Sequence, residues 1–208
     1  MVDAAAQPQL SLNCRAAILV DQDTGTVLYE NNADEQVPIA SITKVMTLLL
    51  TFEAIHNGQL TLETTVPVSE HAYHMGGSQI WLEPGEQFTL DEMIKAICVS
   101  SANDAAVAVA ELVGGSEPAF VERMNARAAE LGMEDTHFSN THGYHDDDHY
   151  TSAYDIYLMC REAMKHETFR TIVGSKNYTM PATNLHPEPR IIRSTNALIS
   201  NFRVAGKE

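Results

Sequence analysis

The sequence predicts an α+β fold, in which a short β-hairpin precedes a series of helices. Residues 15–30, RAAILVDQDTGTVLYE, contain two β-rich stretches on either side of a turn with Gly25, which is typical of a hairpin. Residues 90–165 contain several apolar, helix-compatible stretches with short connections between them. Short connections place consecutive helices side by side, so a helical lobe is expected. Residues 166–208 are expected to form strands and loops.

The helices have their own boundary signals. Ser, Thr, Asp or Asn before an apolar stretch, with an acidic residue three positions later, predicts a helix start, and glycine predicts a stop. A first helix follows Pro38 and ends near Gly58. The others are expected from Thr89 (capping box with Glu92) to Ser100, from Asn103 to Gly114, from Pro118 (cap Ser116) to Leu131, and from Ser152 (capping box with Asp155) to Lys165.

The composition is ordinary for a globular protein with a buried core. The chain has 208 residues, 44% of them hydrophobic and 20% charged, so one domain, or one domain with a lobe, is expected. We assign residues 1–14 to a leader and residues 15–208 to the domain. Thirteen Lys and Arg against 28 Asp and Glu give a net charge of −15, which argues against a nucleic acid partner because phosphate binding needs clustered cations.

Membrane-spanning and metal-binding classes are also disfavoured. No apolar run reaches the roughly 18 residues that a spanning helix needs, and no signal peptide precedes Ala4. Cys14, Cys98 and Cys160 are far apart and match neither a disulfide framework nor a zinc site. We therefore expect no metal among the site residues.

The first candidate catalytic pattern is the S-x-x-K of Ser41-Ile42-Thr43-Lys44. If Ser41 opens the helix after Pro38, Lys44 lies on the same face three residues later. A serine hydroxyl needs an adjacent base to become a nucleophile, and an amine can be that base only when burial or a helix dipole lowers its pKa. The helix start also offers free N–H groups to an oxyanion. The alternative is a serine cap followed by a surface lysine.

The second candidate pattern is Ser101-Ala102-Asn103, at a joint between two predicted helices. A hydroxyl at this joint can relay a proton to or from Lys44, and the Asn103 amide can bind a substrate carbonyl and fix the lysine. The alternative is that Ser101 or Asn103 simply caps the following helix.

Three other features favour structural interpretations. The segment from His145 to His149, HDDDH, has ligand types for a divalent metal, but consecutive side chains point in different directions, so a solvated helix start is preferred. His142 is interpreted as a loop histidine. Trp81, the single tryptophan, is interpreted as an aromatic packed near a turn.

Together the two patterns resemble the penicillin-binding serine acyltransferases. Within this group the sequence most resembles the D-alanyl-D-alanine carboxypeptidases, the low-molecular-mass penicillin-binding proteins. The likeness extends from Arg15 to Arg203 and is carried by the stretches AAILVDQDTGTVLYENNADEQVPIASITKVMT, VSSANDAAVAVAE and THGYHDDDHYTSAYD. It implies the β-lactamase/transpeptidase-like fold, an antiparallel sheet packed with helices beside a helical lobe.

The resemblance implies a function and a place of action. Ser41 would be the acyl-enzyme nucleophile, Lys44 its base, Ser101 a proton relay and Asn103 the group that holds the substrate amide. The substrate would be a peptidoglycan stem peptide ending in D-Ala-D-Ala, in cell-wall synthesis and shape, with β-lactams as inhibitors and no cofactor. The protein would be extracytoplasmic, secreted or held at the outer face of the cytoplasmic membrane.

One departure from the family concerns its third motif, K-T-G or H-T-G, which this chain lacks. In the family this motif lies on a strand after a segment that resembles residues 193–198, and further strands pair with the N-terminal hairpin. We therefore expect a chain without the C-terminal strands, with residues 16–30 as a bare two-stranded ribbon and weak activity alone. A β-lactamase or esterase on the same scaffold, and an inactive peptidoglycan-binding remnant, remain alternatives.

Overall fold

The computed structural model describes residues 10–197 and 199. Its helices are η1 (Ala40–Thr43, a 3-10 turn), α1 (Lys44–His56), α2 (Glu70–Tyr73), α3 (Leu90–Ser100), α4 (Asn103–Gly114), α5 (Glu117–Leu131), α6 (Ala153–Ala163) and α7 (Glu167–Val173). Its strands are β1 (Ala17–Val20), β2 (Val27–Asn31), β3 (Val37–Pro38), β4 (Thr65–Val66), β5 (Phe88–Thr89), β6 (Tyr150–Thr151), β7 (Asn177–Met180) and β8 (Arg190–Arg193).

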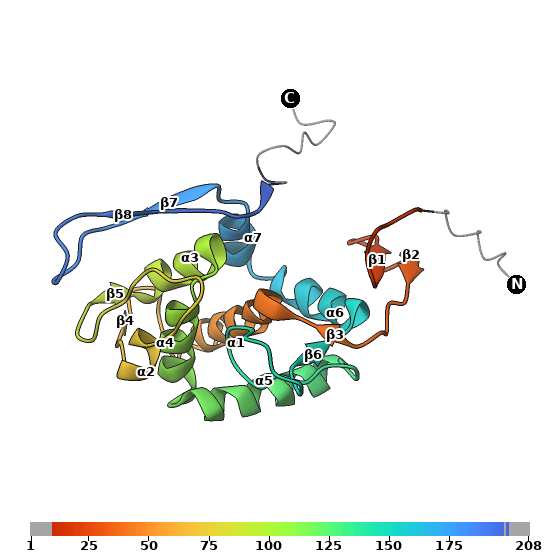
Figure 1. Ribbon diagram of the computed structural model, residues 1–208, viewed down its shortest axis with the longest axis horizontal. Helices are drawn as coiled ribbons and strands as arrows, with labels where there is room; N and C mark the ends of the chain where they lie inside the picture. The colour runs from red at the N-terminus through yellow and green to blue at the C-terminus, as the bar shows by residue number, and fades with distance from the viewer. Residues whose placement is uncertain (1–9, 198, 200–208) are drawn as a thin grey trace, which may run out of the picture.

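The described strands form antiparallel pairs, β1–β2, β3–β6, β4–β5 and β7–β8. The expected hairpin at residues 15–30 is therefore present and is paired only with itself within the described residues. The β3–β6 pair joins the segment before η1 to the segment before α6, so that residues far apart in the sequence lie side by side (Figure 1). The predicted α+β class is confirmed.

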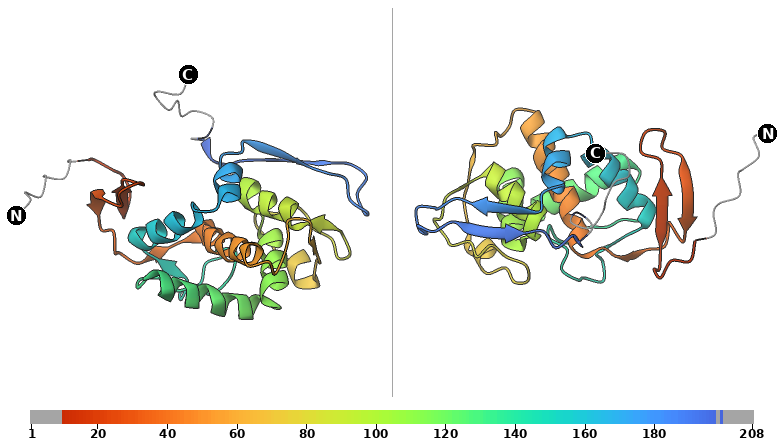
Figure 2. Two further views of the ribbon diagram at one scale, coloured as in Figure 1. Left: turned by 180° about the vertical axis from the view of Figure 1, so that it is seen from behind. Right: turned by 90° about the horizontal axis from the view of Figure 1, so that it is seen from above.

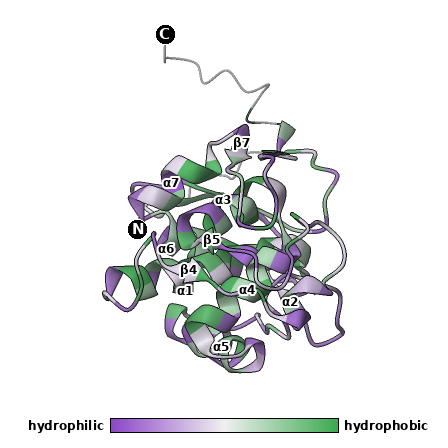
Figure 3. Ribbon diagram, turned by 90° about the vertical axis from the view of Figure 1, so that its left-hand side faces the viewer, coloured by the Kyte–Doolittle hydropathy of each residue, from purple (hydrophilic) through white to green (hydrophobic). Residues whose placement is uncertain are grey.

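Helix α1 lies at the centre and packs against α3, α4, α5 and α6. Its apolar residues separate two clusters: Leu48 and Phe52 pack with α3 and α4, whereas Met46 and Leu49 pack with α5 and α6. Figure 3 shows the apolar residues concentrated toward the middle of the molecule, where α1 and α4 lie. This central position explains why α1 is hydrophobic almost all round.

The two longer hairpins lie at the periphery. The β1–β2 hairpin stands beside α6 at one end of the molecule, and the β7–β8 hairpin extends over α3 toward the other end (Figures 1 and 2). The turn of the β7–β8 hairpin contains the two prolines predicted to exclude a helix from residues 184–189. The helical core therefore holds the site-bearing segments, and the β7–β8 hairpin adds the buried side chains of Met180 and Ile192 to it.

The predicted helix starts agree closely with the structure. Thr89 and Glu92 form the expected capping box, and Ser116 caps α5. Ser152 caps α6 as predicted, but the Asp155 side chain does not complete the predicted capping box. The Asp155 carboxylate instead accepts hydrogen bonds from the Asp135 N–H and the Thr136 hydroxyl. The acidic residue at the third helical position thus anchors a loop from another part of the chain.

Two further predictions about the fold are wrong. Residues 167–173 form α7 instead of a strand or loop, because Phe169 and Ile172 become buried against the α3 side of the core and Phe169 packs edge-on to Phe52, with ring centroids 6.1 Å apart. Trp81 is not packed but 71% exposed, with a positive φ of 62°. The Asp104 carboxylate accepts hydrogen bonds from the N–H groups of Ile80 and Leu82, on either side of Trp81, and so fixes the backbone there.

Some expectations lie outside the described residues. These are most of the leader, residues 1–9, and the C-terminal residues 200–208; the segment 193–198 is described up to Ala197. Among the described helices, none combines the length and the apolar character that crossing a membrane requires.

Candidate active site

The S-x-x-K pattern forms the turn into α1. Ser41 lies in η1, and Lys44 begins α1, so the pattern opens the helix as predicted. The Lys44 Nζ lies 3.1 Å from the Ser41 Oγ and donates a 2.7 Å hydrogen bond to the His142 carbonyl. Lys44 is only 3% exposed, whereas Ser41 faces solvent. The reading of a capping serine followed by a surface lysine is therefore wrong.

Burial lowers the pKa of Lys44 to about 8, against an opposing effect of the Asp104 charge, which raises it. The amine therefore loses its proton far more readily than an exposed lysine. A neutral amine 3.1 Å from a solvent-facing hydroxyl can accept the hydroxyl proton. This is the chemistry that the sequence pattern predicts.

The S-A-N pattern forms the joint between α3 and α4. Ser101 ends α3 with a left-handed φ of 58°, a strained conformation for a residue other than glycine. Asn103 begins α4 and is 4% exposed. The N-cap of α4 is Ala102, without a side-chain cap, so the alternative that Ser101 or Asn103 caps this helix is wrong.

Asn103 is tied to the loop of residues 75–82, which we call the 75–82 loop. Its Nδ2 donates to the Gly76 carbonyl at 2.8 Å, and its backbone N–H donates to the Ser78 carbonyl at 2.7 Å. Because α1 packs against α4, the two predicted patterns lie on neighbouring helix starts. Within the described residues the Lys44 amine hydrogen-bonds to the Ser41 hydroxyl and the His142 carbonyl, so a loop carbonyl fixes Lys44 instead of the expected Asn103 amide.

A second loop, residues 139–149, was missed as part of the site; we call it the 139–149 loop. Its Thr141 and His142 carbonyls accept hydrogen bonds from the side chains of Thr47 and Lys44. A signal for this contact exists in the sequence: Thr43, Thr47 and Thr51 are spaced by four and form a buried polar stripe along an otherwise apolar helix.

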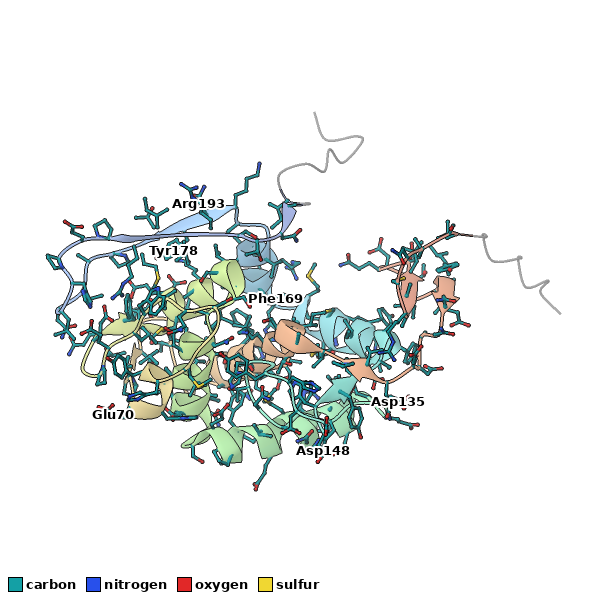
Figure 4. All side chains as sticks on the ribbon, in the orientation of Figure 1. Glu70, Asp135, Asp148, Phe169, Tyr178 and Arg193 are labelled. Atoms are coloured by element: carbon teal, nitrogen blue, oxygen red, sulfur yellow. The ribbon has the colours of Figure 1, made fainter. Side chains whose placement is uncertain are left out.

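The interpretation of HDDDH as a solvated helix start is correct only in that its aspartates are exposed: the strand β6 follows the segment instead of a helix, and the last histidine is not solvated. Asp146, Asp147 and Asp148 are exposed, and Figure 4 labels Asp148 at the surface. His149 is buried and hydrogen-bonded to Thr43. His142 is a loop histidine, as interpreted, but a buried one. Among the described residues, no group of three or more metal-ligating side chains is placed to hold a metal ion.

The sequence matches the family model of the D-alanyl-D-alanine carboxypeptidases over residues 1–203. The chain belongs to this family. It is 45% identical over 173 residues to the D-alanyl-D-alanine carboxypeptidase DacF of Bacillus subtilis, covering 83% of this chain and 44% of DacF. It is 31% identical over 201 residues to DacC of Escherichia coli, covering 93% of this chain and 50% of DacC.

Solved structures of this family share the fold. The D-alanyl-D-alanine carboxypeptidase DacD of Francisella tularensis superimposes with a TM-score of 0.81 at 31% identity, over 85% of this chain and 43% of DacD. Penicillin binding protein 6B of Escherichia coli gives 0.82 at 29% identity, over 93% and 62%. The predicted penicillin-binding, transpeptidase-like fold is confirmed. The chain spans 44% and 50% of DacF and DacC, about half of their length.

Proposed function

We propose that this chain carries the serine acyl-transfer centre of a D-Ala-D-Ala carboxypeptidase. The observation that carries the proposal is the buried Lys44 amine, with its pKa near 8, 3.1 Å from the exposed Ser41 hydroxyl. Family membership supports the substrate class, a peptide ending in D-Ala-D-Ala. The same centre would be acylated by β-lactams, in keeping with its likeness to penicillin binding protein 6B.

The proposed reaction has two covalent steps. Neutral Lys44 accepts the Ser41 hydroxyl proton while the Oγ attacks the carbonyl carbon of the penultimate D-Ala. The bond to the terminal D-Ala nitrogen breaks, and the leaving amine takes a proton that Ser101 passes on from Lys44. Asn103 holds the substrate amide. Water then adds to the ester carbon, the Ser41 oxygen leaves with a proton, and the shortened peptide is released.

The place of action follows from the substrate. Cell-wall peptides are cross-linked outside the cytoplasmic membrane, so we propose an extracytoplasmic enzyme of peptidoglycan synthesis that contributes to cell shape. Exposure of a tagged version to a protease added to intact cells tests this placement. Digestion of the tagged protein is expected, whereas complete protection until the cells are lysed would contradict it.

The test of the chemistry is covalent labelling with a fluorescent penicillin, followed by mass spectrometry of the labelled peptide. The full-length product of the gene is assayed beside the 208-residue chain. We expect label on Ser41, loss of label in Ser41→Ala, and release of D-Ala from a D-Ala-D-Ala peptide. Absence of label from the folded full-length protein would overturn the proposal. Rapid hydrolysis of nitrocefin would favour a β-lactamase instead.

A further inference from the structure

The last histidine of the HDDDH segment has no part in the reaction described above, yet it reaches into the S-x-x-K turn. Its Nε2 lies 2.7 Å from the Thr43 Oγ1, and both residues are buried, His149 at 3% and Thr43 at 0% exposure. Thr43 is the last residue of η1 and directly precedes Lys44. The contact therefore joins the 139–149 loop to the middle of the catalytic pattern.

The hydrogen bonds around this contact fix the position of each proton. The Ser139 N–H donates to the His149 Nδ1 at 2.9 Å, so Nδ1 must be unprotonated. A neutral imidazole then carries its proton on Nε2 and donates it to the Thr43 oxygen. Thr43 in turn donates its hydroxyl proton to the Ala40 carbonyl at 2.7 Å. Burial keeps the imidazole in this neutral form, because it lowers the pKa of His149 to about 4.

The end of this chain of hydrogen bonds is a strained residue. Ala40 has a φ of 48°, in the left-handed region that is unfavourable for a residue with a Cβ. Its carbonyl is the group that Thr43 holds, and its peptide bond leads directly into Ser41. A strained conformation persists only where the surroundings determine it. The bonds from the loop through Thr43 supply that determination at the residue before the nucleophile.

We propose that His149 is a positioning residue for the Ser41 hydroxyl. As a neutral imidazole protonated on Nε2, it links the Ser139 N–H to Thr43 and thereby holds the Ala40 turn that directs Ser41 toward Lys44. Its aromatic ring is itself held in place, since Phe138 packs edge-on against it with ring centroids 5.8 Å apart. The inference rests on the proposed function for its kinetic readout only.

Two substitutions at His149 separate the two bonds. His149→Gln places an amide N–H near the Nε2 position and can still donate to Thr43, whereas His149→Asn places an oxygen near the Nδ1 position and keeps only the bond from Ser139. A displacement of about 1 Å at a reacting group costs on the order of 100-fold in rate. We therefore expect His149→Asn to slow penicillin acylation of Ser41 by about 10- to 100-fold, and His149→Gln to retain the rate within about threefold.

Substitutions at Thr43 provide an independent pair. Thr43→Val keeps the shape but removes the hydroxyl and is expected to lose about as much rate as His149→Asn, while Thr43→Ser is expected to restore it. The loss should appear in the acylation step and leave the reversible binding of penicillin unchanged. His145→Asn is the matched control, because that side chain is 74% exposed in the same loop. Thermal unfolding of each variant identifies any that fail to fold.

The outcomes distinguish this inference from the proposed function. If wild-type protein labels and His149→Asn and Thr43→Val label at its rate, or if His149→Gln falls as far as His149→Asn, the positioning role is overturned. If wild-type protein does not label, the proposed function fails. The structural part is then decided by nitrogen-15 NMR of the imidazole, which is expected to show the Nε2–H tautomer near neutral pH; an Nδ1–H tautomer or a cation would overturn it.

Discussion

The 75–82 loop and the 139–149 loop beside the candidate site differ in whether the helix holds the loop in place or the loop holds the helix. In the 75–82 loop, a helix holds the loop: the Asp104 carboxylate of α4 is 1% exposed and accepts the N–H groups of Ile80 and Leu82 at 3.1 Å each. In the 139–149 loop, the loop holds a helix: its carbonyls bind Lys44 and Thr47, and its terminal histidine binds Thr43.

The difference lies in the kind of polar group that each contact uses. The loop that touches the amine directly does so through a neutral carbonyl, so it adds no charge that would stabilise the ammonium. The charged carboxylate of Asp104, the residue after Asn103 in the chain, raises the pKa of Lys44 less than burial lowers it. A site with a neutral lysine can therefore contain a buried acid, provided that the acid accepts its hydrogen bonds from backbone N–H groups and not from the amine.

The largest effect is expected at Lys44, where the influences of both loops meet. Only the neutral amine can accept the serine proton, so acylation of Ser41 should fall about tenfold per pH unit below a pKa of about 8 and level off above it. Lys44→Gln, which has no titratable base, should lose about 100- to 10,000-fold and the pH dependence with it. Stopped-flow labelling with penicillin across this range gives the profile; a flat wild-type profile would refute the base assignment.

The next effect tests the close approach of the 139–149 loop to η1. Gly143 has a φ of 93°, and a Cβ there would overlap the Ala40 carbonyl oxygen. Gly143→Ala should therefore lower the free energy of unfolding by about 3 kcal/mol or more, since backbone and not a flexible side chain must move. Urea denaturation measures this loss.

Gly85→Ala is the matched control for that substitution. Gly85 has a similar φ of 83° but nothing within 4 Å of its Cβ position, so only the cost of the left-handed backbone, about 1–2 kcal/mol, is expected. Equal losses in the two variants would mean that the contact between Gly143 and Ala40 carries no energy of its own.

A smaller effect is expected in the other loop. Asp104→Asn keeps the size of the side chain but places an amide N–H against backbone donors, which should cost about 1–3 kcal/mol of unfolding free energy. It also removes the charge that raises the pKa of Lys44, so the acylation profile should move to lower pH. Asp147→Asn, at a fully exposed carboxylate, is the control and should change neither. A profile that moves to higher pH would contradict the electrostatic argument.

Sequence patterns predicted those parts of the fold and site that depend on residues close together in the chain. The Ser41–Lys44 pair needs only the spacing of one helical turn, and the capping box of Thr89 and Glu92 is local as well. The joint at Ser101 and Asn103 was predicted from its place between two helices, and the resemblance to a family added the roles of these residues in the reaction. What it did not supply is which group binds the lysine, because His142 comes 98 positions after Lys44.

The errors have the same physical origin. His149 looks solvated beside three aspartates, and only the β3–β6 pairing brings it to Thr43, 106 positions earlier. Residues 167–173 have no strong helix signal in the sequence. They form α7 because the helix buries Phe169 against Phe52. Trp81 looks like a core residue by type, yet Asp104 fixes the backbone on both sides of it and leaves the ring in solvent.

The smallest effect concerns this tryptophan, at the far end of the 75–82 loop from the bonds to Asn103. With 71% of its surface exposed, Trp81 gains little from burial, while its φ of 62° is unfavourable for a large side chain. Asparagine tolerates the left-handed region, so Trp81→Asn should raise the free energy of unfolding by about 0.5–1 kcal/mol. Trp81→Phe retains the strain and should leave it unchanged. A loss of stability in Trp81→Asn would mean that the indole makes contacts worth more than the strain, and that the 75–82 loop is held by its side chains as well as by Asp104.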